Sequence, residues 1–328
     1  MDTPRLISDV TTTTPASTES ISLIIYVLSA VIAKLGTITN VLSLSYFIMK
    51  IRSGTLRRKM DLITTKLFVA LNVFDLLLSV SAILFFTSLK IYNGDASLPF
   101  CAATYTIFSA CLFTTSFLTC LLAVVRAIYL IYPLHEVRWS LIEVSILVYS
   151  VAVVAILSMR VIISPDSYYF KTTNMIVHYT RFLIVAILFF VVVVSNVLTM
   201  GKLFSSQSQR DTASKGKRKA TITVGIISAI YCLFNIGFVV IAGISLCSMS
   251  MYENIPIEII DTVIYILLPL NSACNPVVYF TRRSDMRSYL KVLWKRLTEL
   301  FSFRKSEITS QAKGNPLCLN QPMQASLS

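Results

Sequence analysis

The dominant pattern in this sequence is a series of long apolar stretches separated by short polar segments. A helix needs about 20 mostly apolar residues to cross a bilayer, and seven stretches qualify: 22–49, 62–91, 98–132, 139–163, 179–203, 218–247 and 257–280. They lack the period-two alternation of a transmembrane β-barrel, the other fold that can span a bilayer. The pattern therefore predicts an all-α membrane protein with a seven-transmembrane helix bundle over residues 22–280.

Composition points to the same fold class. Of the 328 residues, 55% are hydrophobic and 14% are charged, whereas a soluble domain carries about 25% charged residues. This balance disfavours a soluble enzyme, a disordered protein and a disulfide-stapled secreted domain. The chain has only two His residues and few acids within the spans, so we expect neither enzyme activity nor a cofactor.

The net charge of +13 lies mainly between the spans rather than on one soluble face, which disfavours nucleic-acid binding. Cytoplasmic segments of membrane proteins carry an excess of Lys and Arg. In this chain the excess falls in the first, third and fifth connections and after the last span. The positive-inside rule thus predicts an extracellular N-terminus and a cytoplasmic C-terminus.

The two ends of the chain differ in character. Residues 1–21, rich in Thr and Ser, are predicted to form an extracellular tail. Residues 281–301 are predicted to form an amphipathic helix on the inner membrane surface, because apolar and basic residues take opposite helical faces. Residues 302–328 are predicted to be a disordered cytoplasmic tail, in which Cys318 is either palmitoylated or a free thiol.

Several polar residues interrupt the apolar stretches, and Asp75 in the second is the most costly of them. The amides and hydroxyls available to it are Asn40, Thr115, Asn271, Ser272 and Asn275. Two interpretations stay open: a structural hydrogen-bond network, or a site for a sodium ion or a proton. Lys34 in the first stretch either snorkels outward, faces the bundle interior or pairs with a carboxylate.

The seventh stretch ends in Asn275-Pro276-Val277-Val278-Tyr279. Pro276 removes a helix hydrogen bond and introduces a kink, on which Tyr279 can swing. With Asn271 and Ser272 one turn earlier and an amphipathic helix following, this motif resembles the rhodopsin-like (class A) G-protein-coupled receptors. The resemblance covers all seven spans, since further landmarks occur in the family's order: Asn40, Leu71, Asp75, Cys101, Arg126, Pro133 and Lys219-Ala220-Thr221.

The resemblance implies a plasma-membrane receptor that binds an extracellular ligand and activates a heterotrimeric G protein. It also implies arrestin and receptor kinases as partners at the Ser and Thr residues of the tail, and contact with membrane lipids. Arg126, Tyr231, Asn275, Pro276 and Tyr279 would serve coupling and activation. The implied ligand pocket comprises Phe108, Cys111, Leu112, Phe238, Ala242, Asp261 and Tyr265.

The sequence departs from the family pattern at several positions. Val125 and Lys217 stand where members place acids that hold the Arg126 equivalent inactive, which predicts high ligand-independent signalling. Phe108 replaces the Asp of amine receptors and Pro269 the Lys of opsins, which disfavours monoamines and retinal. The family's Cys101 partner is missing from the loop at about 164–178, so no disulfide is predicted.

These departures resemble the divergent receptors of invertebrates, and both a neuropeptide receptor and a chemosensory receptor stay open. The missing acid beside Arg126 keeps a further alternative, a receptor-like membrane protein that couples weakly to G proteins. A small transporter is less favoured, because transporters show paired repeats with broken helices and this chain shows no internal repeat.

Overall fold

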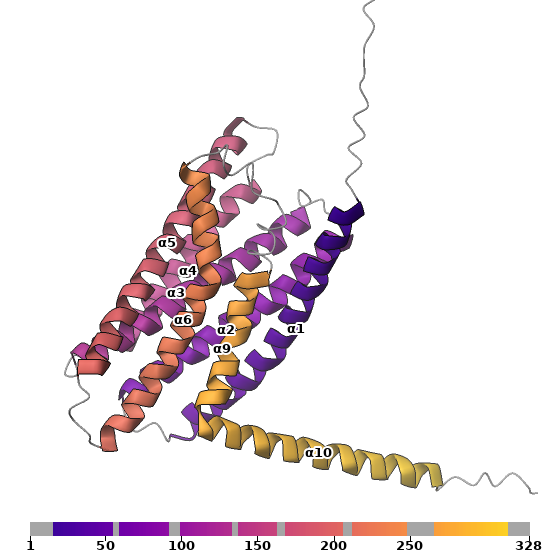
Figure 1. The fold of residues 1–328 in the computed structure, drawn as a ribbon. Helices are drawn as coiled ribbons and strands as arrows, with labels where there is room; N and C mark the ends of the chain where they lie inside the picture. Colours follow the sequence, from indigo (N-terminus) through magenta and orange to yellow (C-terminus); the bar gives the residue numbers. More distant parts are fainter. Residues whose placement is uncertain are drawn as a thin grey trace, which may run out of the picture. The chain divides into compact units, whose positions relative to one another are not determined.

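The computed structural model describes residues 16–54, 59–91, 99–132, 137–162, 168–205, 212–247 and 266–313. Every regular element among these residues is a helix (Figure 1). In chain order the helices are α1 (Ala16–Arg52), α2 (Lys59–Ile91), α3 (Pro99–Ile131), α4 (Trp139–Ile162), α5 (Tyr168–Ser205), α6 (Thr212–Cys247), α9 (Leu268–Arg282) and α10 (Ser284–Lys313). The chain forms two units, Met1–Arg282 and Arg283–Ser328.

Within the described part of the chain, six helices, α1 to α6, are long and apolar enough to cross a membrane. The all-α fold class and the multi-pass membrane character predicted from the sequence are thereby confirmed. The seventh predicted stretch lies partly outside the described residues, and the 15 residues of α9 are shorter than a complete span requires. A count of seven spans and the orientation of the chain therefore stay predictions.

α3 is the central helix of the first unit (Figure 1). Its apolar span is 72% buried, compared with 11% for that of α4. It packs against α2, α4, α5, α6 and α9. Small and hydroxyl residues such as Ala110, Thr114 and Ser116 are buried along it, and residues of this size let membrane helices approach closely.

α9 carries the Asn-Pro motif and packs against α1, α2 and α6. It follows a π-helical turn at residues 266–267, and Pro276 lies in its interior. Because proline has no N–H, the carbonyl of Ser272 loses its helical hydrogen bond. The backbone is therefore weakened at the level where α9 faces α2.

The helices at the two ends of the described chain are longer than the sequence pattern predicts. α1 begins at Ala16, within the predicted extracellular tail, since a helix can extend beyond its apolar span into water. α10 continues to Lys313, well past residue 301. Its end coincides with Gly314 and Pro316 in the sequence, the residue types that terminate helices.

α10 forms the described part of the second unit. Arg287, Lys291, Lys295 and Arg296 are exposed along it, and Lys295 pairs with Glu299 at 3.9 Å. The basic face predicted for this helix is therefore present.

Candidate functional site

The first element of the candidate site is a hydrogen bond between α2 and α9. The Asp75 side chain is completely buried. Asn275 donates from Nδ2 to Asp75 Oδ2 across 2.9 Å. The neighbours of Asp75 in the sequence, Phe74, Leu76 and Leu77, favour insertion into the membrane. A buried carboxylate needs a hydrogen-bond partner, and the side-chain amide of Asn275 on α9 supplies it.

Two hydroxyls converge on the backbone of the same residue. Ser79 donates to the Asp75 carbonyl at 2.9 Å, and Ser272 of α9 reaches that carbonyl at 3.5 Å. Ser272 is also the residue whose carbonyl receives no helical N–H hydrogen bond, because the residue four positions later is Pro276. The polar contact between α2 and α9 therefore lies at the proline-containing segment of α9.

The structure joins only part of the predicted network by hydrogen bonds. Asp75, Ser272 and Asn275 are in contact, as predicted. The Thr115 hydroxyl instead donates to the Leu112 carbonyl of its own helix, and the Asn40 amide donates to the Gly36 carbonyl of α1. Both residues are buried, and the Asn40 Oδ1 atom has no hydrogen-bond partner among the described residues.

Several buried oxygen atoms at this level have no hydrogen-bond partner among the described residues. They are Oδ1 of Asp75, Oδ1 of Asn271 and Oδ1 of Asn275. Buried polar atoms are normally satisfied, and an orphaned one calls for an explanation such as an ion or a water. All three are oxygens, which is the ligand type that hard cations such as sodium take.

Gly36 brings α1 against the same contact. A Cβ at Gly36 would lie 2.8 Å from Ser79 Oγ and 3.4 Å from Ala273 Cβ. A Cβ atom at 2.8 Å from Ser79 Oγ would be too close, so the Ser79 side chain or the helix backbone would have to move. Glycine thus lets α1 approach α2 and α9 at the turn of Ser79, whose hydroxyl bonds to Asp75. The sequence pattern did not single out Gly36 or Ser79, because small residues in an apolar run carry no periodic signal.

About one helical turn after the Asn275-Pro276 bond, the side chain of Tyr279 is buried in an aromatic cluster. Its ring lies edge-on to Phe47 of α1 at 5.3 Å and to Phe68 of α2 at 4.8 Å. Phe47 and Phe68 stack on each other at 5.3 Å. These geometries are the preferred ones for aromatic pairs. Tyr279, which the sequence predicts to move on activation, is packed between two neighbouring helices in this structure.

The remaining residues that the sequence predicts to serve coupling lie in α3 and α6. Arg126, near the end of α3, is buried, and so is Val125 beside it. Tyr231 is fully buried in a cluster with Cys120, Leu188 and Val192. Asn235, one turn further along α6, donates to the Tyr231 carbonyl at 2.8 Å.

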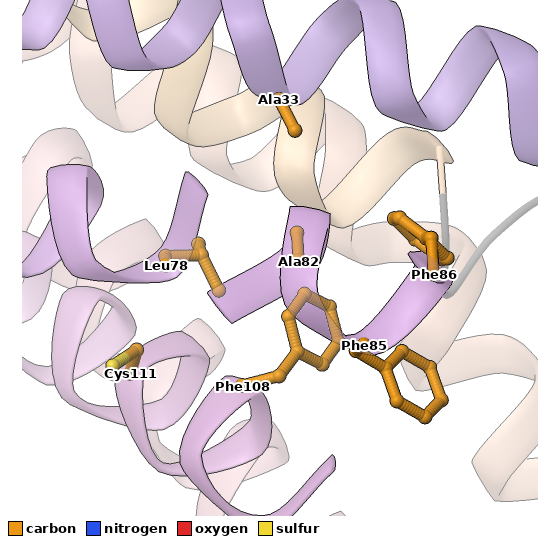
Figure 2. Packing of buried hydrophobic residues seen from close by; sticks show 7 residues of the cluster. All are labelled: Ala33, Leu78, Ala82, Phe85, Phe86, Phe108 and Cys111. Atoms are coloured by element: carbon orange, nitrogen blue, oxygen red, sulfur yellow. The ribbon is translucent and has the colours of Figure 1, made fainter. Parts of the chain in front are cut away.

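The predicted pocket residues of α3 belong to the apolar core. Phe108 stacks on Phe85 of α2 at 5.9 Å, and Phe108 and Cys111 share a cluster with Ala33 and Leu78 (Figure 2). Leu112 packs against this cluster. Phe238 of α6 belongs to another cluster, with the core residues Ala110, Phe113, Val153 and Val185. Whether these residues contact a ligand stays a prediction.

Some predicted residues cannot be placed. Asp261, Tyr265 and Cys318 lie outside the described residues, as do the side chains of Cys101 and Ala242. Among the described cysteines, Cys111, Cys120, Cys232 and Cys274 are free.

A second feature missed by sequence reasoning joins α3 to α4. Phe117 and Tyr149 stack at 4.1 Å with their planes 8° apart. This stacking gives Tyr149 an aromatic partner on the neighbouring helix.

Comparison of the chain with known protein families and with curated proteins finds no match. The functional assignment therefore rests on the residues and contacts described above.

Proposed function

We propose that the chain is a seven-span, rhodopsin-like G-protein-coupled receptor of the plasma membrane, with its N-terminus outside. The observation that carries this proposal is the Asp75–Asn275 bond, formed one residue before the helix-breaking Pro276 and one turn before buried Tyr279. A polar lock beside a kink is a suitable two-state element, because a small change at one packed contact can shift a whole helix.

In this proposal a ligand entering from outside, either a peptide or a small chemosensory molecule, changes the packing of α3, α6 and the seventh span. Arg126 at the inner end of α3 then engages the G protein. Residues 257–280 form the seventh span, and α10 lies on anionic lipid of the inner leaflet through its basic face. Arrestin and receptor kinases act on the cytoplasmic tail.

The sodium interpretation is part of the same proposal. Asp75 would hold the ion through its orphaned Oδ1, with Asn271 as a second oxygen donor. A sodium ion would balance the buried carboxylate charge and so favour the packed arrangement of α2 and α9. The alternatives are a proton on Asp75 and a purely structural network.

One observation keeps the weak-coupling alternative alive. Val125 is buried beside Arg126, at the position where family members carry an acid. A weakly coupling receptor-like protein would bind its ligand but catalyse little nucleotide exchange on a G protein.

Nucleotide exchange is the test of the proposed function. A receptor samples its active state without ligand, so membranes containing the protein are expected to accelerate GTP-analogue uptake several-fold by at least one G-protein family. Arg126→Ala should return uptake to the level of empty membranes. Arg138→Ala, which removes an exposed Arg nearby, is the matched control and should not. If no family responds to surface-expressed wild type, the weak-coupling alternative holds instead.

The number of spans and their orientation can be tested by glycosylation mapping. The sequence contains no Asn-x-Ser/Thr acceptor, so each engineered acceptor is read without background. Thr11→Asn is expected to be glycosylated, and Ser206→Asn and Glu307→Asn are expected to stay unmodified, as measured by an endoglycosidase mobility shift. Glycosylation of both the Thr11→Asn and Glu307→Asn variants would mean an even number of spans and would contradict the receptor topology.

A further inference from the structure

Lys34 is a charged residue on the outside of the helix bundle. It occupies the centre of α1, and its side chain is exposed. The structure thus excludes the interpretation that Lys34 faces the bundle interior. Among the described acids, none forms an ion pair with it.

The packing of the adjacent residue indicates the depth of Lys34. Ala33 is buried against Leu78 and Ala82 of α2, well inside the apolar span Asp61–Ser88. Ile24, where the candidate span of α1 begins, is about 15 Å away along the helix axis at 1.5 Å per residue. A Lys that meets hydrocarbon at this depth is costly and usually has a functional partner.

Lys34 also belongs to a regular surface row, which we call the α1 seam. Its members are Ile24, Val27, Val31, Lys34, Ile38, Val41, Ser45 and Ile48, spaced alternately by three and four residues. The six apolar members are exposed by 38% to 63%, and Leu28, Leu35 and Met49 beside them are exposed to a similar degree. α1 lies at the edge of the first unit (Figure 1), and among the described helices it packs against α2 and α9.

This spacing is that of a helix-pairing surface. Apolar residues repeating every 3.5 positions keep one line of side chains against a partner helix, and a single polar member fixes its register. Membrane helix pairs commonly adopt the same left-handed crossing.

From these observations we propose that the α1 seam docks a transmembrane helix of a partner protein that carries an Asp or Glu at the depth of Lys34. Charge complementarity selects this occupant. A second copy of the chain in the same orientation would place Lys34 against Lys34, and like charges in a low-dielectric medium repel strongly. The proposal does not depend on G-protein coupling.

The test uses the full-length protein in phosphatidylcholine vesicles and a synthetic single-span probe. The probe is a Leu/Ala-rich helix with one Glu at the matching depth, compared with the same helix carrying Gln. Energy transfer between labelled probe and labelled protein measures binding. Wild type is expected to bind the Glu probe at least about tenfold more tightly than the Gln probe, the lower range of coupling for charged pairs. Lys34→Gln should lose this preference, and Lys34→Glu should instead prefer a Lys-bearing probe.

A matched pair of substitutions tests the seam itself. Ile38→Ala lies on the seam and should weaken Glu-probe binding, whereas Ile187→Ala on α5, at nearly the same exposure (58% and 54%), should not. Equal binding of the Glu and Gln probes, or an equal loss in both Ala variants, would overturn the proposal. So would Lys34-dependent association between copies of the chain. A Lys34 dependence that appears only with anionic lipid would assign the residue to a lipid phosphate instead.

Discussion

Gly36→Val is expected to remove most of the protein from the cell surface and to lower its thermal unfolding midpoint. A Cβ at this position meets Ser79 Oγ at 2.8 Å, and valine adds two methyl groups at the same place. Overpacking of this kind costs about 1–3 kcal/mol. The cost is raised here because the displaced Ser79 hydroxyl must also give up its bond to the Asp75 carbonyl.

The control for this substitution is Gly201→Val, because a Cβ at Gly201 meets nothing within 4 Å. The two variants make the same chemical change in a helix, so they separate steric conflict from helix propensity. Surface labelling and thermal unfolding of the purified proteins provide the measurements. Equal behaviour of the two variants would show that α1 does not pack closely on α2 and α9.

Asp75→Leu is expected to be the most destabilising of the polar substitutions at the site. It leaves the Asn275 amide without the acceptor that it has at 2.9 Å, and a buried donor left unsatisfied costs about 1–3 kcal/mol. Asp75→Asn keeps an acceptor oxygen and should therefore retain the fold. Asn72→Leu is the matched control, since Asn72 is equally buried on α2 but its amide bonds within that helix, to the Phe68 carbonyl.

The midpoint of thermal unfolding should be clearly lower for Asp75→Leu than for Asp75→Asn and Asn72→Leu. A comparable loss in Asn72→Leu would mean that any buried amide or carboxylate on α2 is equally important.

The same Asp75→Asn variant distinguishes the interpretations of the carboxylate. Replacing KCl by NaCl at equal concentration is expected to lower nucleotide exchange by wild type and to leave Asp75→Asn unchanged. Coupling between an effector and a conformational state is typically 5- to 150-fold, and the lower end of that range is measurable here. If pH acts on wild type and sodium does not, the proton interpretation holds. If neither acts, the network is structural.

Hydropathy predicts the helices of this protein well because each span must satisfy its backbone internally. It also locates Asp75, since a carboxylate in an apolar run needs a partner. Asn275 follows as a candidate because it precedes the proline of another span.

Hydropathy does not predict which face of each helix points inward, because lipid and protein core are similarly apolar. Hydropathy does not predict, for example, that Phe108 stacks on Phe85 of α2, and its predicted place in a ligand pocket stays a prediction. Thr115 was predicted to reach Asp75, yet its hydroxyl stays with its own helix. The close helix contact at Gly36 is not predicted by hydropathy either, because such contacts depend on the absence of a side chain.

If the Asp75–Asn275 bond controls activation, as proposed, exchanging the two residues should preserve nucleotide exchange better than changing either one alone. Asn275→Asp alone places two carboxyl groups against each other, and two adjacent carboxyl groups do not readily carry a negative charge at the same time. Of the variants in this exchange, it should impair nucleotide exchange most. The double variant Asp75→Asn with Asn275→Asp restores one amide and one carboxylate with the donor reversed. The double variant is expected to regain much of wild-type nucleotide exchange, with a coupling energy between the two substitutions of about 0.5–3 kcal/mol. Additive losses in the double variant would contradict it.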